Sequence, residues 1–237
     1  MQELAYTALE PVRVPRPGDR MELILAHARG RKVFDLGALD ETAFESKRDN
    51  GRWLHARLCE VASEVIGVDN SPLVPAGGLS TRHNGRIVNA DIFDLGALVS
   101  AYGRPDVVVA GELIEHLPDT MHFLRSMKSC PELAGVEFVF STPNACSWHN
   151  VLVGMGGRES MHRDHLQVYS YKTLRTMFER AGTTLHSLEP YHVRFDEMRE
   201  QSTGLARAAV GGFQRVVNML ELVAPMLSGG WVGVARL

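Results

Sequence analysis

Cysteine is scarce in this sequence, and neither sign of charge is in large excess. The three cysteines, Cys59, Cys130 and Cys146, are widely spaced and form no CxxC pair, which favours a reduced, cytoplasmic protein. A formal net charge of −3 gives no general attraction to nucleic acid or anionic lipid, although it leaves a local basic patch open. Composition alone therefore indicates an ordinary soluble globular protein.

Long hydrophobic runs are also missing. Residues 1–20 have no apolar core of the kind a signal peptide needs, so we expect an N-terminal arm followed by one domain over residues 21–237. The apolar stretch Leu205–Leu227 is interrupted by charged side chains, which rules against a membrane span. We expect it to be helical, kinked or split at residues 211–212, and packed on the sheet. A homodimer contact and a surface for a lipid-linked substrate are the alternatives.

What the sequence does contain is a regular alternation of short apolar runs and helical patterns. Seven runs are expected to be strands: Lys32–Leu36, Glu64–Val68, Arg86–Asn89, Asp106–Ala110, Val136–Ser141, Thr184–Glu189 and Trp231–Arg236. Helical patterns lie near residues 21–29, 52–63, 94–102, 114–129, 171–181 and 203–226. Strands separated by helices predict an α/β fold with a doubly wound, seven-stranded, mostly parallel sheet.

Polar residues and glycines follow the ends of the first four expected strands. In chain order these are Asp35 and Gly37, Asp69 and Asn70, Asp91 and Ile92, and Gly111 and Glu112. Because the carboxyl ends of parallel strands share one edge of a sheet, these residues would line one crevice. An acid after the second strand is well placed for both hydroxyls of a ribose, and an acid after the third for an adenine amino group. The set predicts a site for an adenosine-containing cofactor.

Five segments resemble, in order and spacing, the motifs of class I S-adenosylmethionine-dependent methyltransferases. They read VFDLG, EVIGVDNS, VNADIFDL, DVVVAGELIEHL and FVFSTPN, and the resemblance covers residues 31–182 plus the terminal strand. It implies a Rossmann-like methyltransferase fold and S-adenosylmethionine as the cofactor. It also implies that Asp69 holds the ribose, Asp91 and Ile92 the adenine, and the Gly37 loop the methionine part, with Asp35, Asn70 and Gly111 completing the cofactor site.

The loop after Asp35 departs from this family. The family usually carries a GxGxG run there, which lets the backbone approach the cofactor, whereas this chain has Gly37 alone. The stretch from Asp35 to Asp69 is also longer than in the family, and its extra residues are polar. We expect a modified but working cofactor loop, closed by Trp53 or His55. The alternative is a degenerate site that no longer binds cofactor.

Glu112, Glu115 and His116 are spaced i, i+3 and i+4, so a helix starting just after Gly111 would carry all three on one face. The pattern resembles that of two metal-using methyltransferase branches, the ubiquinone-pathway O-methyltransferases and the small-RNA 2′-O-methyltransferases. In the second branch a downstream histidine completes the metal shell, and His165 is the matching residue. The resemblance implies Mg²⁺, Mn²⁺ or Zn²⁺ on these four residues. The alternative is a metal-free site in which His116 is the general base and Glu115 orients it.

Residues 145–165, between the fifth strand and the next helix, are rich in glycine and in apolar side chains. An insertion at that position would overhang the crevice and contact the acceptor, so we expect a lid. The alternative is an ordinary surface connection.

Together these features predict an S-adenosylmethionine-dependent O-methyltransferase that acts on a hydroxyl of a small molecule. A looser resemblance to methyltransferases of bacterial polysaccharide and natural-product pathways favours a sugar or a glycosylated or polysaccharide precursor as the acceptor. RNA 2′-O-methylation is one alternative, although the chain has no extra RNA-binding domain and no basic excess. A non-catalytic adenosine-binding or scaffold protein is the other, because of the single glycine.

Overall fold

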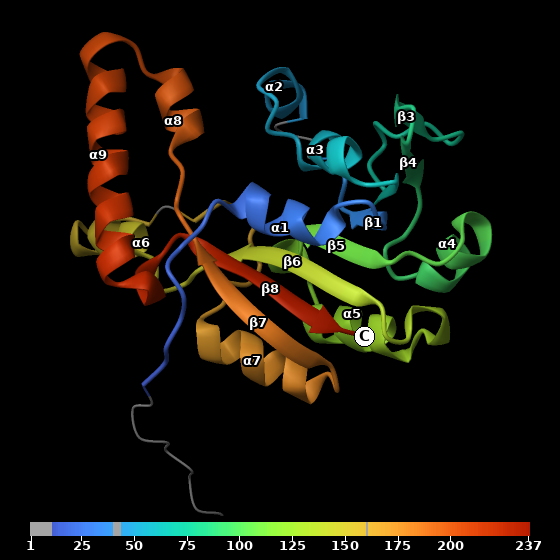
Figure 1. Cartoon of the computed structure of the whole chain (residues 1–237). Coiled ribbons are helices and arrows are strands. Elements are labelled where there is room, and N and C mark those ends of the chain that lie inside the picture. Colours follow the sequence, from blue (N-terminus) through green and yellow to red (C-terminus); the bar gives the residue numbers. More distant parts are fainter. Residues whose placement is uncertain (1–10, 40–43, 160) are drawn as a thin grey trace, which may run out of the picture.

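An eight-stranded sheet forms the centre of the protein, seen in a computed structural model (Figure 1). The structure describes residues 11–39, 44–159 and 161–237. The strand order across the sheet is β3-β4-β2-β1-β5-β6-β8-β7. The strands are β1 (Lys32–Leu36), β2 (Glu64–Asp69), β3 (Leu79–Arg82), β4 (Gly85–Asn89), β5 (Val107–Gly111), β6 (Glu137–Pro143), β7 (Thr184–Tyr191) and β8 (Gly230–Arg236).

The five central strands β4, β2, β1, β5 and β6 run parallel, whereas β8 is antiparallel to both β6 and β7. The predicted α/β class and mostly parallel sheet are confirmed, but the predicted count of seven strands is wrong. The additional strand is β3, which pairs antiparallel with β4 at the sheet edge. Its sequence, LSTR, alternates half-buried and exposed residues. A short polar edge strand carries no apolar run by which it could be recognised.

Helices cover both faces of the sheet because side chains along each strand point alternately to opposite sides. Val33 and Phe34, adjacent on β1, accordingly belong to separate apolar clusters. The Val33 cluster includes residues of α1 (Arg20–Ala28) and α3 (Leu54–Val61). The Phe34 cluster includes residues of α4 (Leu95–Tyr102), α5 (Thr120–Ser129) and α7 (Tyr171–Arg180). The remaining elements outside the C-terminal helices are α2 (Phe44–Asp49), α6 (Trp148–Met155), η1 (Ile114–His116), η2 (Pro131–Leu133) and η3 (Pro225–Leu227).

Gly233 in β8 leaves room for an aromatic ring. A Cβ placed on Gly233 would lie 2.2 Å from the Phe140 ring, which stacks on Phe178 with ring centroids 4.8 Å apart. We expect Gly233→Ala to lower the free energy of unfolding by about 1–3 kcal/mol, because the buried ring must move. Gly96→Ala is the control: nothing lies within 4 Å of a Cβ built on Gly96 in α4. Urea unfolding measures both changes, and a Gly233→Ala protein as stable as the wild type would contradict the packing.

Helix α9 (Gly204–Val223) follows α8 (Asp196–Gln201), and the two helices stand away from the sheet (Figure 1). The prediction that this stretch packs on the sheet is wrong, since only Val217 and Glu221 of α9 are buried. The expected split into two helices is also wrong, because α9 is one helix across Gly211 and Gly212. Within the described parts of the chain, every helix is too short or too polar to cross a bilayer.

Two other predicted segments fall partly outside the described residues. Residues 1–10 of the expected N-terminal arm lie outside them, whereas Gly18 pairs with Tyr191 and Asp19 caps α1. Residue 160 of the expected lid lies outside them too. The rest of that segment contains α6, which packs against α9. Its role as a lid stays a prediction.

Candidate active site

The chain leaves β5 through a left-handed turn at Glu112, whose φ is 53°. A 3₁₀ turn, η1 (Ile114–His116), follows and contains both Glu115 and His116. The expected arrangement, with three ligands on one helix face from Gly111 onward, is therefore wrong. The turn gives Glu112 a different direction from the other two side chains.

The predicted helix over residues 114–129 is broken for a local reason. Pro118 disfavours helical backbone at the residue before it. The Asp119 side chain accepts a hydrogen bond from the His122 N–H at 2.8 Å and so caps the start of α5 at Thr120. The residues before Pro118 are therefore limited to the short turn η1.

Glu112 is bound by residues from distant parts of the chain. The Tyr191 hydroxyl donates to its carboxylate at 3.1 Å, and Arg20 Nη1 lies 3.9 Å from the same oxygen. Arg20 also donates to the Ser141 hydroxyl at the end of β6. Burial first, and then the nearby Glu112 carboxylate, raise the pKa of Tyr191 well above its ordinary value, so this phenol stays protonated as a donor. Glu112 thus lies near the histidines without belonging to the group whose ligand atoms come together, and its charge still acts on His165 and Glu115.

Glu115, His116 and His165 form the cluster that the structure does bring together. Each offers a ligand atom, and these atoms all lie within 4.8 Å of one another. The backbone fixes the arrangement, because the N–H groups of Leu166 and Gln167 both donate to the Glu115 carbonyl oxygen. The His116 and His165 rings lie 4.7 Å apart, centroid to centroid. The structure therefore brings together three of the four residues predicted as metal ligands, and metal binding by them stays a prediction.

The electrostatics of this cluster are unusual. Glu115 is fully buried, and neither of its carboxylate oxygens has a hydrogen-bond partner among the described residues. Burial, with the neighbouring Glu112 charge, raises the pKa of Glu115 well above its ordinary value. His165 Nδ1 is likewise buried without a partner, and burial together with His116 and His162 lowers the pKa of His165. Unpartnered buried groups are costly, and a bound cation would satisfy them.

The residues predicted to hold the cofactor do gather at one edge, at the carboxyl ends of β1, β2, β4 and β5. Two of their acids already have partners in the chain. The Asp69 carboxylate accepts from the backbone N–H groups of Leu39 at 2.8 Å and Ser71 at 2.9 Å. Asp35 is paired with His55 at 3.0 Å. In contrast, the bond that the Asp91 carboxylate accepts within the described part of the chain comes from the Phe93 N–H in the following turn.

The single-glycine loop after β1 adopts a compact form. Gly37 has a left-handed φ of 69°, and a Cβ there would lie 2.9 Å from the Leu113 side chain. The Trp53 indole N–H donates to the Ala38 carbonyl at 2.8 Å, and Phe44 meets the Trp53 ring edge-on. Trp53 therefore does contact this loop, as predicted, while residues 40–43 of the inserted stretch lie outside the described part of the chain.

Three residues of this edge were not found from sequence: Arg20, Leu113 and Tyr191. Arg20 and Tyr191 come from the first helix and the seventh strand, and no local pattern marks either of them. Leu113 sits inside the recognised motif, but its contact with Gly37 depends on the left-handed turn at Glu112. These are contacts that only the three-dimensional structure provides.

A family model described as a methyltransferase domain matches residues 15–188, which include the carboxyl ends of β1, β2, β4 and β5. The chain belongs to this methyltransferase family. It is accordingly an S-adenosylmethionine-dependent methyltransferase enzyme. Comparison with curated proteins gives no match.

Solved structures share the fold of this methyltransferase at low sequence identity. A chain from the Haloferax volcanii complex of the Trm112 methyltransferase activator with a putative methyltransferase is 18% identical, with a TM-score of 0.51 over 91% of this chain and 87% of that chain. Magnesium protoporphyrin IX methyltransferase from Synechocystis PCC 6803, with bound SAH, is 15% identical, with a TM-score of 0.53 over 91% and 81%. The small RNA methyltransferase HEN1 is 14% identical, with a TM-score of 0.55 over 97% of this chain and 27% of that one. At these identities the likeness shows the fold alone.

Proposed function

We propose that this methyltransferase transfers a methyl group to a hydroxyl oxygen, with a divalent cation held by Glu115, His116 and His165. The observation that carries the proposal is the buried Glu115 carboxylate. Among the described residues neither of its oxygens has a hydrogen-bond partner of good geometry, and it lies within 4.8 Å of ligand atoms of His116 and His165. When bound, a divalent cation supplies the Lewis acidity that lowers the pKa of a hydroxyl and fixes its position. A mixed carboxylate and imidazole set suits Mg²⁺, Mn²⁺ or Zn²⁺.

His116 is prepared for such a role by its backbone contact. Its Nδ1 lies 3.1 Å from the Asp164 carbonyl oxygen, and because a carbonyl can only accept, Nδ1 carries the proton. This leaves Nε2 with a free lone pair, for use as a metal ligand or as a general base. The same tautomer thus serves the metal-assisted reaction and the metal-free alternative.

The carboxylates and backbone groups at the strand ends suit an adenosine-containing methyl donor. Asp91 and Ile92 would hold the adenine, Asp69 the ribose and the backbone at Gly37 the methionine part, with S-adenosylmethionine supplying the electrophilic methyl group. Asp69 is 8% exposed and already accepts the Leu39 N–H. Ribose hydroxyls would bind the acceptor sites of this carboxylate that its bonds to Leu39 and Ser71 leave, or displace one of those bonds.

For the acceptor we favour a sugar or a glycosylated or polysaccharide precursor, which rests on the resemblance to polysaccharide-pathway methyltransferases. RNA 2′-hydroxyls are the second candidate. They are favoured by the Glu115, His116 and His165 cluster, by the exposed Arg163 beside it, and by the fold shared with HEN1. Retention on RNA that falls steeply with added salt would favour the second candidate over the first.

Calorimetric titration with S-adenosylhomocysteine tests cofactor binding without any knowledge of the acceptor. We expect saturable binding at one site, and a loss of about 10–100-fold in affinity for Asp91→Ala, since a charge-assisted hydrogen bond is removed. Asp49→Asn is the matched control, because Asp49 is exposed on α2 and, among the described residues, forms its ion pair with the neighbouring Arg48.

The titration also separates the proposal from its non-catalytic rival. No binding by the wild type, with or without Mg²⁺, would mean that the Leu39–Asp69 contact permanently closes the ribose position. The chain would then be a member of the family with a degenerate cofactor loop.

A further inference from the structure

The side of α9 that faces away from the protein is apolar and exposed. Its residues follow one another at alternating spacings of four and three, which places them in one row along the helix. We call this row the outer face: Leu205, Ala209, Gly212, Val216, Met219 and Val223. Leu205 is 90% exposed, Val223 84% and Met219 67%, values far above those usual for large apolar side chains.

The neighbouring helix α6 is apolar and exposed as well. It packs against α9 and itself buries no residue. Val151, Leu152 and Met155 of α6 are exposed as well, Met155 by 83%. Two neighbouring helices thus present apolar side chains to the outside, a larger area than isolated exposed residues would give.

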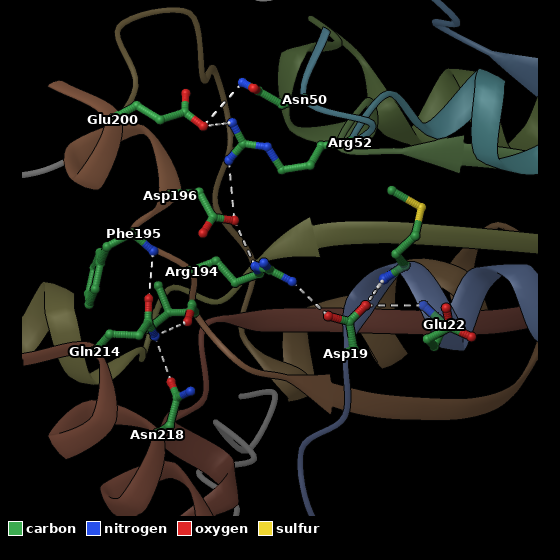
Figure 2. A network of polar contacts seen from close by, with 12 residues as sticks. Asp19, Glu22, Asn50, Arg52, Arg194, Phe195, Asp196, Glu200, Gln214 and Asn218 are labelled. Carbon is green, nitrogen blue, oxygen red and sulfur yellow. Dashed lines mark hydrogen bonds and ion pairs between the residues drawn. The ribbon is translucent and has the colours of Figure 1, made fainter. Parts of the chain in front are cut away.

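The opposite side of α9 is fixed to the protein by polar contacts. Gln214 accepts a hydrogen bond from the Phe195 N–H at 2.7 Å, and Glu221 accepts from the Val193 N–H at 3.1 Å. Helix α8 is held in turn through Asp196 and Glu200, which both pair with Arg52 (Figure 2). The orientation of α9 is therefore determined from its inner side, and its outer face is left for another occupant.

Arginines gather to one side of the outer face, toward α8. Arg215 flanks the outer face, whereas Arg207, two residues after Leu205, lies on the other side of the helix. A hollow of about 460 Å³ between α8 and α9, here called the arginine pocket, is lined by Arg199, Gly204, Arg207, Ala208, Gly211, Gly212 and Arg215. Gly212 belongs both to this pocket and to the outer face. Within the described residues, none of the three arginines forms an ion pair, and the one acid of α9, Glu221, is buried beside His192. The arginine pocket therefore carries positive charge that no ion pair among the described residues neutralises.

An apolar face next to arginines that form no ion pair among the described residues favours an anionic bilayer over a second copy of the chain as the partner of α9. Consider two copies whose α9 helices pair antiparallel through their outer faces, with the symmetry axis between Gly212 and Val216. Arg215 of each copy would then lie close to the axis and repel Arg215 of the other copy. The surface of an anionic bilayer offers both parts that are required, an apolar layer for the outer face and phosphate groups for the arginines. The formal charge of −3 on the whole chain does not oppose this, because the positive charge is local.

We propose that the outer face of α9 and the adjoining face of α6 dock the enzyme on an anionic phospholipid surface, with lipid phosphates in the arginine pocket. Docking there does not depend on the methyl-transfer chemistry proposed above. It would hold the strand ends near the bilayer, since α6 begins shortly after β6 leaves the sheet.

Flotation of the full-length protein with vesicles tests the proposal. We expect binding to phosphatidylcholine vesicles that contain phosphatidylglycerol, little binding to phosphatidylcholine alone, and a loss of binding as salt is added. Replacing Arg199, Arg207 and Arg215 together with alanine should weaken binding about a hundredfold. Met219→Asp should abolish it, whereas the control Leu73→Asp, which changes an exposed leucine between β2 and β3, should not alter it.

Three results would overturn the proposal: no flotation with anionic vesicles, equal flotation with neutral ones, or a dimer in sedimentation velocity that Met219→Asp dissociates. The last would assign the outer face to a second copy. Because all substituted side chains are exposed, each variant is expected to fold, and its thermal unfolding is compared with that of the wild type. S-adenosylhomocysteine affinity should not change in any of them, which separates lipid docking from cofactor binding.

Discussion

Glu115→Gln is expected to make the protein more stable and less active at the same time. The buried carboxylate has no hydrogen-bond partner among the described residues, so the neutral amide of similar shape should raise the free energy of unfolding by about 1–3 kcal/mol. Loss of a metal ligand, or of the group that orients His116, should lower methyl transfer by roughly 10²–10⁴-fold. Both effects come from the same side chain: the Glu115 carboxylate is costly to bury, but the proposed methyl transfer requires it.

The first half of this prediction needs no acceptor substrate. Urea unfolding in EDTA gives the stability of the wild type and of Glu115→Gln. Addition of Mn²⁺ should then stabilise the wild type, by about 2.7 kcal/mol at a hundred times its dissociation constant, and leave the variant unchanged. His165→Ala should behave like Glu115→Gln toward Mn²⁺, since it removes a second member of the cluster.

Glu112→Gln is the informative control. The sequence pattern includes Glu112 among the metal ligands, whereas the structure binds it to Tyr191 and Arg20 instead. Mn²⁺ binding that survives Glu112→Gln and disappears in Glu115→Gln would support the cluster in the structure. If the wild type binds no Mn²⁺, the metal-free alternative is favoured, with His116 as the general base.

The case of Glu112 shows what sequence reasoning can and cannot reach here. Strand ends follow from hydrophobic runs, so the positions of Asp35, Asp69 and Asp91 at one sheet edge were predictable. Residue spacing gives side-chain direction only when the backbone type is known. Here the left-handed turn at Glu112 and the proline after Leu117 replace the expected helical backbone, so the spacing no longer gives the side-chain directions.

The C-terminal helices show a second limit. The apolar pattern of α9 predicts a helix with an apolar side, and this is correct, but the pattern does not say what that side contacts. Its position is set by single polar pairs between distant residues, such as Gln214 with the Phe195 backbone and Arg52 with Glu200. Contacts of this kind leave no periodic signal in the sequence.

The second large effect that we expect is a loss of stability at alkaline pH, caused by His55. The ring is fully buried between the Asp35 carboxylate at 3.0 Å and the Thr81 hydroxyl at 2.9 Å. Burial alone would lower its pKa, but the hydrogen bonds and charges of Asp35 and Cys59 raise the pKa of His55 from 6.5 to about 9. Charged His55 can donate from both ring nitrogens to these partners.

The sign of the effect follows from the direction of this shift. The folded protein holds the proton more tightly than the unfolded chain does, so the contribution is fully present below pH 6.5 and is lost as the pH rises through about 9. A shift from 6.5 to about 9 corresponds to roughly 3 kcal/mol. We expect the free energy of unfolding to fall by that order between pH 6 and pH 10 through this residue.

His55→Gln isolates the effect from other groups that titrate in the same range. The amide cannot gain or lose a proton, so the wild type should lose more stability than the variant over this interval. Equal pH profiles would contradict the raised pKa of His55. The consequence reaches the cofactor site, because a Cβ on Gly67 would meet both the His55 ring, at 2.9 Å, and the Ala38 side chain, at 2.8 Å. The His55 ring also packs against Trp53, whose indole N–H bonds the Ala38 carbonyl next to Leu39. We therefore expect S-adenosylhomocysteine affinity to weaken over the same pH range as stability does.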